Sequence, residues 1–390
     1  MIWKIIFWVS VLALFYNYLI YPFILMVASR AKTGNQEFYT SEKSFPVVSI
    51  LLAVYNEEDV LEEKMKSLFE LIYPEEKIEI LVGSDASTDR TNDILKSLTE
   101  ENELLKNEFF KERMGKVKII NKLAKKARGE ILIITDANTI HKPNSLKLLV
   151  RNFKNKKIGL VDSVMSHTGL DHSGISIQET TYVQWESRIK KMEGMLWGSM
   201  MGPSGGFYGI RKTLFHPVPE NFLVDDFYIN MKVLENQSWA ICEPLSFVVE
   251  DVSNNWLEEF RRKTRISAGN FQNLNKFAHL LLKVFQPVGF CFLSHKVLRW
   301  FGPFFLLLAL LSSAMNYEET FFMILFYVQL ILLISPIFDY ILRKIKIHIV
   351  ILRFITHFYN TNLAILAGFL WFLKGIKTNV WQPTKRNQSQ

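Results

Sequence analysis

Long uncharged runs occur at both ends of the 390-residue chain, and the N-terminal run covers residues 5–29. A helix needs about 20 predominantly apolar residues to cross a bilayer. The pattern therefore predicts a transmembrane signal anchor over residues 1–30. A cleaved signal peptide is the alternative, but its apolar region usually has only about 7–15 residues and ends in a small-residue cleavage site. We find no such site in this run.

Two further uncharged runs lie near the C-terminal end, at residues 300–317 and 320–338, with only a short turn between them. They predict a transmembrane hairpin. Residues 354–373 are also uncharged, but polar side chains occupy the first half, so this run is either a third span or a tilted, re-entrant segment. The expected layout is interfacial helices at 256–298, a transmembrane region with two or three spans at 299–375, and a polar tail at 376–390.

Basic residues close to the predicted spans indicate the orientation, because Lys and Arg concentrate on the cytoplasmic side. Arg30 and Lys32 follow the first span, and Arg343 and Lys344 follow the hairpin. This arrangement predicts an integral protein of the cytoplasmic membrane whose middle segment faces the cytoplasm. Because a crossing by residues 354–373 would leave the basic residues of the tail outside, we expect the tail to be cytoplasmic as well.

Residues 46–255 show a different pattern, in which short β-rich runs alternate with helical stretches, as in an α/β domain. Strands are predicted at 47–56, 78–83, 117–120 and 131–134. Their apolar runs are typical of a parallel sheet whose two faces are covered by crossover helices. We therefore predict an α/β fold with a mostly parallel sheet. The charged segment 98–116 is expected to continue a solvated helix rather than to form a binding loop.

Polar side chains stand where the predicted strands end, at the edge where open α/β sheets bind ligands. Tyr55 and Glu57 follow the first strand, Asp85 follows the second, and Asp136 and Asn138 follow the last. Carboxylate and amide oxygens suit hard divalent ions, which often share their ligands with substrate phosphates. The spacing of Asp136 and Asn138 therefore predicts Mg²⁺ or Mn²⁺ held against a diphosphate, and a plain turn is the alternative.

The net charge of +8 raises the question of nucleic-acid binding, but no basic helix with interleaved aromatic residues accompanies it. Attraction to anionic lipid headgroups accounts for the charge more simply. We therefore expect membrane lipids, and no nucleic acid, among the partners of the protein.

Several other notable residues are expected to be structural. Cys242 and Cys291 lie far apart and fit neither a metal spacing nor a disulfide framework, so both are read as packing residues. Glu179, Glu186 and Glu193 recur every seven residues along a predicted helix, which is typical of a solvated face.

Seven motifs follow one another in order: AVYNEE (53–58), GSDASTD (83–89), GKVKIIN (115–121), ARGEILIITDANT (127–139), GPSGGFYGIRK (202–212), VDDF (224–227) and RRKTRISAG (261–269). Together they resemble the family 2 glycosyltransferases, inverting enzymes of GT-A fold that include cellulose, chitin and hyaluronan synthases. The resemblance covers roughly residues 46–275, and the flanking apolar runs fit the membrane-embedded branch. It implies a GT-A type sheet and a nucleotide-sugar donor.

The resemblance also implies which residues bind the donor. Tyr55, Glu57 and Asp85 would contact the base and ribose, with Lys116 nearby. Asp136 contributes to the donor site and, with Asn138, takes the place of the DxD metal motif, although the second carboxylate is here an amide. An amide oxygen can ligate Mg²⁺ or Mn²⁺ but brings no charge to the ion.

On the acceptor side, the 202–212 motif resembles a loop in which Ser204, Gly205 and Gly206 let the backbone approach a sugar closely. The acidic pair at 224–227 places Asp225 at the acceptor and Asp226 in the position of the catalytic base. Inverting transfer is a single displacement that needs one general base within reach of the acceptor hydroxyl, and a carboxylate can serve.

The last motif stands where processive members carry Q-x-x-R-W. Arg262 falls on the Gln position, Arg265 on the Arg position and Ile266 on the Trp position. The two arginines would grip the donor diphosphate in a bidentate fork, or instead face lipid headgroups from an interfacial helix. The absent Trp weakens the case for a long-chain polymerase without weakening the case for sugar transfer.

The chain is thus predicted to be a membrane-bound, metal-dependent, inverting glycosyltransferase that moves a sugar from a UDP-linked donor to a glycan or lipid-linked acceptor. A processive polysaccharide synthase is one alternative, and it would need a homo-oligomer or an export partner to form a channel. A non-catalytic, nucleotide-binding membrane scaffold is the other.

Overall fold

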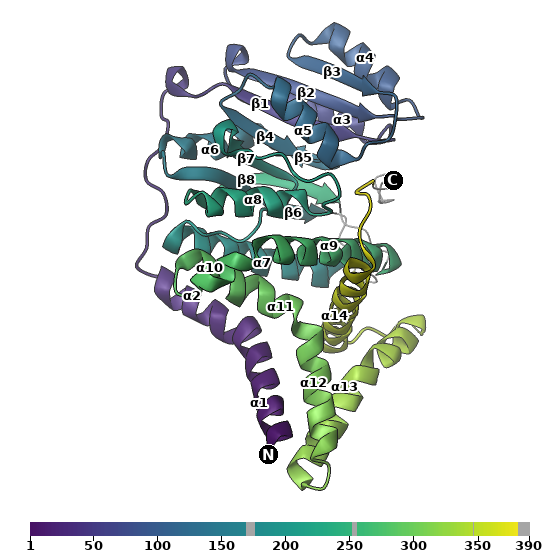
Figure 1. Cartoon of the computed structure of the whole chain (residues 1–390). Helices are drawn as coiled ribbons and strands as arrows, with labels where there is room; N and C mark the ends of the chain where they lie inside the picture. Colours follow the sequence, from purple (N-terminus) through teal and green to yellow (C-terminus); the bar gives the residue numbers. More distant parts are fainter. Residues whose placement is uncertain (169–175, 252–255, 346, 381–390) are drawn as a thin grey trace. The chain divides into compact units, whose positions relative to one another are not determined.

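The computed structural model describes residues 1–168, 176–251, 256–345 and 347–380. The chain divides into two compact units. The sheet unit comprises Ala28–Gly169, Val183–Ser253 and Ile376–Gln390, and the helical unit comprises Met1–Val27, Leu170–Tyr182 and Asn254–Gly375. Figure 1 labels the strands of the sheet unit and the long helices of the helical unit.

An eight-stranded sheet forms the centre of the sheet unit, in the order β3-β2-β1-β4-β7-β6-β8-β5. Its first half consists of β1 Val48–Val54, β2 Ile78–Asp85, β3 Leu105–Phe110 and β4 Ile131–Thr135. These four strands run parallel to one another. Every residue of β1, β2 and β4 is buried, as expected for strands that are covered on both faces.

The second half of the sheet mixes strand directions and consists of β5 Thr139–His141, β6 Ile158–Thr168, β7 Phe207–Arg211 and β8 Trp239–Asp251. β7 runs antiparallel to β4 and β6, and β5 runs antiparallel to β8, whereas β6 and β8 are parallel. Four of these seven strand pairings are parallel. The predicted α/β fold is confirmed, with a purely parallel first half inside a mixed sheet.

The helices of the sheet unit include α3 Leu61–Phe69, α4 Thr91–Glu101, α5 Lys116–Lys126, α6 Ser145–Val150 and α8 Asp225–Glu235. The strand predicted at 117–120 is wrong, because these residues belong to α5. Val117, Ile120 and Leu123 are buried and lie three residues apart, which is the spacing of one helical face. A short apolar run in the middle of this face resembles a strand when it is read alone.

The third parallel strand is β3, inside the segment that was expected to be a solvated helix, so that expectation is wrong for residues 105–110. β3 lies at the edge of the sheet beside β2. Leu105 is buried, whereas the charged side chain of Lys106 is exposed. Charged residues are common on edge strands because they discourage pairing with other chains. Such a strand lacks the apolar run that identifies the inner strands.

The helical unit contains α1 Ile2–Phe15, α2 Tyr21–Ser29 up to Val27, the first residues of α7 Ser176–Trp197, α9 Trp256–Phe277, α10 Pro287–Cys291, α11 Leu298–Trp300, α12 Gly302–Met315, α13 Thr320–Lys344 and α14 Val350–Lys374. α9 packs along α14, α1 packs against α12, and α13 packs against α14. At the α9–α14 contact, a Cβ atom on Gly368 would lie 2.5 Å from the Cβ of Ser267. The Ser267 hydroxyl also donates to the Ile365 carbonyl at 3.0 Å, so the two helix backbones approach closely.

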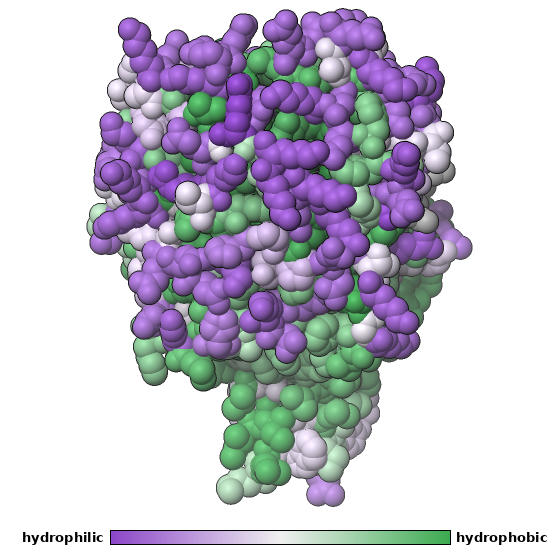
Figure 2. Space-filling model, turned by 45° about the horizontal axis from the view of Figure 1, so that its top comes forward, coloured by the Kyte–Doolittle hydropathy of each residue, from purple (hydrophilic) through white to green (hydrophobic). Residues whose placement is uncertain are grey.

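Two helical stretches are long and apolar enough to cross a membrane, namely Ile2–Ser29 and Thr320–Lys344. Pro287–Trp300 and Gly302–Met315 would form a third if the pair, which is bent by 59°, crosses as one span. By the same measure of length and composition, α14 is not a candidate within the described part of the chain. α1 and α13 expose many large apolar side chains, and Figure 2 shows hydrophobic residues gathered in a green region with few hydrophilic ones.

The two cysteines are free and buried. Cys242 is 9% exposed in β8, and Cys291 is fully buried in α10. Burial raises the pKa of the Cys242 thiol to about 12. Both positions agree with the expectation that these residues serve packing.

Candidate active site

The carboxyl ends of β1, β2 and β4 lie at one edge of the sheet, because these strands are parallel. The backbone turns sharply after two of them, where Asn56 and Ala86 have φ values of 51° and 56°. Such positive values are uncommon for residues other than glycine. Hydrogen bonds join the two turns: Thr88 N–H donates to Asn56 Oδ1 at 2.8 Å, and Glu57 N–H donates to Thr91 Oγ1 at 2.9 Å. The predicted donor residues after β1 and β2 therefore stand on connected turns.

Asp85 is fully buried, and its carboxylate accepts three hydrogen bonds. The donors are Met114 N–H at 2.6 Å, Gly115 N–H at 3.0 Å and Arg113 Nε at 3.1 Å. The guanidinium carbon of Arg113 lies 3.2 Å from the ring centroid of Tyr55. Arg113 thus links two residues that were predicted to bind the donor. Sequence reasoning missed Arg113 because it follows the edge strand that the pattern assigned to a helix.

Lys116 is the positive centre of an acidic cluster at the same edge. Its Nζ donates to Asp136 Oδ1 at 2.7 Å and lies 3.8 Å from Asp225 Oδ2. Burial by itself would lower the pKa of Lys116, but attraction by Asp136, Asp225 and Asp226 outweighs burial, and the pKa is raised. Lys116 therefore remains an ammonium ion, and three predicted site carboxylates share this one cation.

Asp226 is the second residue of α8 and is partly buried. Its Oδ1 accepts a hydrogen bond from Phe227 N–H at 2.7 Å. Burial and repulsion by Asp225 raise the pKa of Asp226 to about 7, although Lys116 and the hydrogen bond oppose the rise. A carboxyl group that titrates near neutral pH is suited to general base catalysis.

The predicted acceptor-side loop connects Asp136 to Asp226. Gly205 has a φ of +87°, and a Cβ atom there would lie 2.8 Å from Asp226 Oδ2. Both facts require glycine at this position. The Gly206 carbonyl accepts hydrogen bonds from Thr135 Oγ1 at 2.8 Å and from Asp136 N–H at 3.3 Å. Residues 205 and 206 therefore hold the turn after β4 beside the start of α8.

Ser204 of the same loop is held by a buried ion pair. Its hydroxyl donates to Asp162 Oδ2 at 3.1 Å and accepts from Lys190 Nζ at 2.8 Å, while its N–H donates to Asp162 Oδ2 at 2.9 Å. Asp162 and Lys190 are 0% and 3% exposed and lie 3.0 Å apart. The pair fixes the loop, and a contribution of Ser204 to acceptor binding stays a prediction.

Asp136 and Asn138, the predicted metal ligands, offer few side-chain oxygens to a metal ion. The Asn138 side-chain N–H donates to Glu250 Oε1 at 2.9 Å, so its amide oxygen is the atom that would ligate. Within residues 1–168, 176–251, 256–345 and 347–380, no group of three or more His, Cys, Asp or Glu side chains is placed to hold a metal ion. Mg²⁺, however, often binds through one or two carboxylates and substrate phosphates. The surplus of carboxylates over Lys116 therefore fits a divalent ion that is shared with a diphosphate.

A buried lysine supports the turn that carries Asp136. Lys64 is fully buried, and its Nζ lies within 3.0 Å of hydrogen-bonding atoms of Thr135, Thr139 and His141. Burial lowers the pKa of Lys64 well below its usual value. Sequence reasoning missed this residue because a lysine on an amphipathic helix is normally solvated. Only its three-dimensional neighbours distinguish it from an exposed lysine.

Arg262 and Arg265, which were predicted to bind the donor, lie on α9 in the helical unit. The Arg262 guanidinium pairs with Glu259 at 2.9 Å and with Glu179 at 3.3 Å. These carboxylates account for the position of Arg262 within the helical unit. The donor-binding role of both arginines stays a prediction.

The glutamate series along α7 is not a solvated face. Glu179 and Glu193 are 3% and 0% exposed, so the expectation is wrong for both. Burial by itself would raise the pKa of Glu179, but Lys263, 2.6 Å away, and further partners lower it well below its usual value. Glu193 accepts a hydrogen bond from Met201 N–H at 3.0 Å. The seven-residue spacing is that of one helical face, but protein groups rather than water satisfy the carboxylates of Glu179 and Glu193.

Comparison with known proteins agrees with this arrangement. Residues 49–218 match the model of the family described as glycosyl transferase family 2. Over 253 residues, the chain is 24% identical to the probable glycosyltransferase YdaM of Bacillus subtilis, covering 62% of this chain and 59% of that protein. Over 120 residues, it is 35% identical to the beta-monoglucosyldiacylglycerol synthase of Nostoc sp., covering 30% and 26% of the two chains. The chain thus spans less than two thirds of the length of either relative.

Among solved structures, the mannosyltransferase PcManGT from Pyrobaculum calidifontis has a TM-score of 0.71 at 19% sequence identity. The match covers 95% of this chain and 99% of that chain, and it shows a shared fold of GT-A type. The match over residues 49–218 and the shared fold thus agree with the resemblance to glycosyl transferase family 2.

Proposed function

We propose that the protein is a membrane-bound, inverting glycosyltransferase that transfers a sugar from a nucleotide-sugar donor to a glycan or lipid-linked acceptor. The observation that carries this proposal is the cluster of Asp136, Asp225 and Asp226 around Lys116. Within this cluster the pKa of Asp226 is raised to about 7. A base and a cation-binding cluster at one place meet the needs of a single displacement from a diphosphate.

The donor side is assigned to the turns after β1 and β2. Tyr55, Glu57 and Asp85 would contact the base and ribose, and the Lys116 ammonium group would attract the diphosphate. A UDP-linked sugar is the first expectation. PcManGT is in complex with GDP-Man and Mn²⁺, so GDP-linked sugars belong in the same test.

Asp136 would hold a divalent ion, Mg²⁺ or Mn²⁺, with the amide oxygen of Asn138 as a second ligand. Such an ion, when bound, supplies positive charge that stabilises the leaving diphosphate. The Asp136 side chain is 36% exposed and is oriented by Lys116, while Glu250 orients Asn138. Both side chains are therefore positioned before a donor arrives.

Asp226 would act on the acceptor. Its carboxylate accepts the proton of the acceptor hydroxyl while that oxygen attacks the anomeric carbon of the donor. The new C–O bond forms as the bond from the anomeric carbon to the diphosphate oxygen breaks, and the nucleoside diphosphate leaves with the bonding electrons. Attack from the opposite face inverts the anomeric configuration. Ser204, Gly205, Gly206 and Asp225 are the proposed acceptor contacts.

The acceptor is proposed to be presented at a membrane. The relative in Nostoc is named as the synthase of a glycolipid, and two helical stretches of this chain are apolar enough to span a bilayer. A processive synthase is the second candidate, and Ile266 in the position of the Trp of processive members weighs against it. Product length on a defined primer distinguishes the two reactions.

We propose a cytoplasmic-membrane location in which residues 1–30 form the anchor, 46–255 the cytoplasmic catalytic domain, 256–298 interfacial helices and 299–375 the transmembrane region. The start of the 376–390 tail supports one part of this layout. Asn221 Nδ2 donates to the Ile376 carbonyl at 3.2 Å, and the described residues 376–380 group with the sheet unit. The tail and the catalytic domain would therefore share one side of the membrane.

The test uses full-length protein purified in detergent and a panel of UDP- and GDP-sugars, with release of nucleoside diphosphate as the readout, with and without Mg²⁺ or Mn²⁺. We expect turnover with at least one donor, and loss of turnover with retained nucleotide binding in Asp226→Asn. Nucleotide binding without turnover of any donor by the unaltered protein would favour the scaffold alternative.

A further inference from the structure

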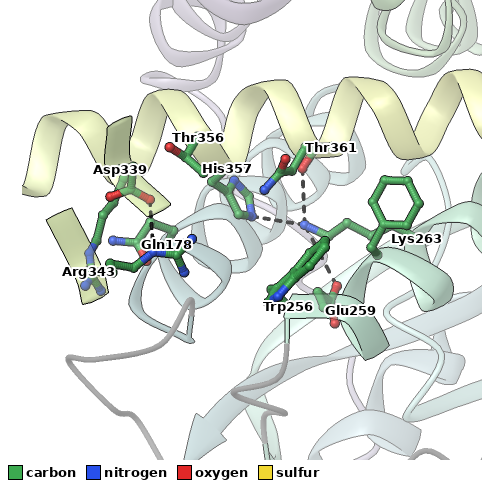
Figure 3. A pocket seen from close by; sticks show the side chains of 12 residues that line it. Gln178, Trp256, Glu259, Lys263, Asp339, Arg343, Thr356, His357 and Thr361 are labelled. Carbon is green, nitrogen blue, oxygen red and sulfur yellow. Dashed lines mark hydrogen bonds and ion pairs between the residues drawn. The ribbon is translucent and has the colours of Figure 1, made fainter. Parts of the chain in front are cut away.

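The helical unit contains a polar hollow that the proposed transfer reaction does not use. It is partly open to solvent and is lined by residues of α7, α9, α13 and α14. Figure 3 shows Asp339 and Arg343 on one side, and Lys263, His357 and Thr361 on another, with their side chains around a common space. Every lining residue belongs to the helical unit.

The lining carries more cationic than anionic side chains. The cationic residues are Lys263, Arg343 and Arg353, and the anionic residues are Glu259 and Asp339. Some of these charges compensate one another: Arg343 lies 3.3 Å from Asp339, and Lys263 lies 2.6 Å from Glu179, which is outside the lining, and 3.8 Å from Glu259. The sum over the lining is nevertheless positive, which favours an anionic ligand.

Two buried oxygen atoms in the lining lack hydrogen-bond partners. Gln178 and Thr356 are 4% and 5% exposed. Among the residues that the structure describes, none forms a hydrogen bond with Gln178 Oε1 or Thr356 Oγ1. Leaving such atoms unsatisfied destabilises a fold, so a ligand that offers hydroxyl donors would stabilise this one. These two oxygens are independent of the charge argument and indicate hydroxyl groups beside the anionic group.

The hollow involves the last turns of an apolar helix that is a candidate span. Asp339 and Arg343 follow the uncharged part of α13, and Ile337, Phe338 and Ile341 on the same turns are 60%, 58% and 52% exposed. Apolar side chains next to the first charged residues of a span are typical of the boundary between lipid tails and headgroups. Basic pockets between helices at this depth bind anionic lipid headgroups.

We propose that this hollow binds the headgroup of an anionic phospholipid that also carries hydroxyl groups. The phosphate would contact Arg343, and the headgroup hydroxyls would donate to Gln178 and Thr356. The proposal rests on α13 as a membrane span and is independent of the reaction assigned to Asp226. The ligand would anchor α13 and α14 to α7 and α9 within the helical unit.

The test measures lipid binding to full-length protein in detergent by native mass spectrometry. The probes are short-chain phosphatidylglycerol, short-chain phosphatidylcholine and free glycerol 3-phosphate. We expect phosphatidylglycerol to bind at least tenfold more tightly than phosphatidylcholine, and glycerol 3-phosphate to bind weakly. Equal binding of the two lipids would overturn the site, and tight binding of glycerol 3-phosphate would replace the lipid by a soluble phosphate ligand.

Three variants locate the binding. Arg343→Gln should lose the preference for phosphatidylglycerol, whereas Lys344→Gln should keep it, because Lys344 is exposed on the same helix and does not line the hollow. Thr356→Val keeps the side-chain shape and should weaken phosphatidylglycerol binding by about tenfold without altering phosphatidylcholine binding. An equal effect of Arg343→Gln and Lys344→Gln would show general charge attraction and overturn the site. Asp226→Asn should bind the lipid normally, so failure of the proposed transfer reaction leaves this test intact.

Discussion

A Cβ atom added to Gly205 would lie 2.8 Å from Oδ2 of Asp226, and the backbone at Gly205 has a φ of +87°. The loop that we propose for the acceptor side and the candidate base are therefore adjacent. This contact makes the position of Asp226 sensitive to a single methyl group.

We expect Gly205→Ala to lower kcat by about 10–100-fold, because a displaced base no longer lies within reach of the acceptor hydroxyl. The matched control is Gly375→Ala. Gly375 has the same φ of +87°, but no atom lies within 4 Å of an added Cβ. The control carries the backbone strain, about 1–2 kcal/mol, without the contact. Comparable loss of kcat in both variants would attribute the effect to strain rather than to Asp226.

The pH dependence of transfer should follow Asp226. Its pKa in the folded protein, about 7, is raised above the ordinary value of 3.8, chiefly by burial. Because the base must be deprotonated, kcat/KM should rise roughly tenfold per pH unit below pH 7 and level off above it. The same shift acts oppositely on stability: the folded state binds the proton more tightly, so this contribution is lost as the pH rises from about 4 to 7. A profile that is flat from pH 5 to 8 would exclude Asp226 as the base.

Lys116 should tune this titration. Its positive charge lowers the pKa of Asp226, so Lys116→Met should move the acid limb of kcat/KM to higher pH and reduce donor binding. Lys118→Met is the matched control, because Lys118 lies on the same helix and pairs with Glu220 at 2.8 Å instead. The full pH profile of each variant is the measurement. An unmoved acid limb in Lys116→Met would mean that the limb belongs to another group.

If a divalent ion binds as proposed, substitutions of Asp136 and Asn138 should lower the activity to different extents. Only Asp136 would bring charge to the ion, so Asp136→Ala should cost more activity than Asn138→Ala. Nucleotide release measured at a series of Mn²⁺ concentrations should also show a higher metal requirement in Asn138→Ala than in the unaltered protein. Equal turnover in EDTA and in Mn²⁺ would remove the ion from the reaction.

The buried pair of Asp162 and Lys190 should contribute to stability. Lys190→Met leaves the Asp162 carboxylate buried without its counter-charge, and such a change costs about 3–5 kcal/mol of unfolding free energy. Denaturant unfolding is the measurement, and Lys191→Met, at the exposed neighbouring position, is the control. The double variant Asp162→Asn, Lys190→Met should recover part of the loss. Equal stability of Lys190→Met and the control would show that the pair is dispensable.

The sequence was most informative where apolar pattern and chain order act together. Asp85 and Asp136 could be placed at one sheet edge because they follow apolar strands, and parallel strands end together. Asp226 could be added only through the resemblance to a known family. Lys64 could not be recognised, because it is a charged residue in a helical pattern and its partners lie more than 70 residues away in the sequence. Glu193 lies in a similar pattern, and its partner Met201 lies just beyond the end of α7.

The edge strand β3 is a second feature that the sequence pattern could not predict. β3 has too few apolar residues to be identified by periodicity, and its misassignment hid Arg113, which bridges Tyr55 and Asp85. The position of Asn379 near the C-terminal end is a third such feature. Asn379 is 7% exposed and lies against Gly115, next to Lys116, yet nothing in a polar tail predicts a buried position. The burial of Asn379 depends on its contact with Gly115, a residue that is distant in the chain.

The burial of both cysteines gives the natural chain a practical advantage. A buried thiol reacts poorly with maleimides, and the raised pKa of Cys242 suppresses the reactive thiolate further. Single cysteines introduced into exposed turns would therefore be labelled over a low background. Reagents that cannot cross a bilayer would then report, turn by turn, which side of an intact cell each connection occupies.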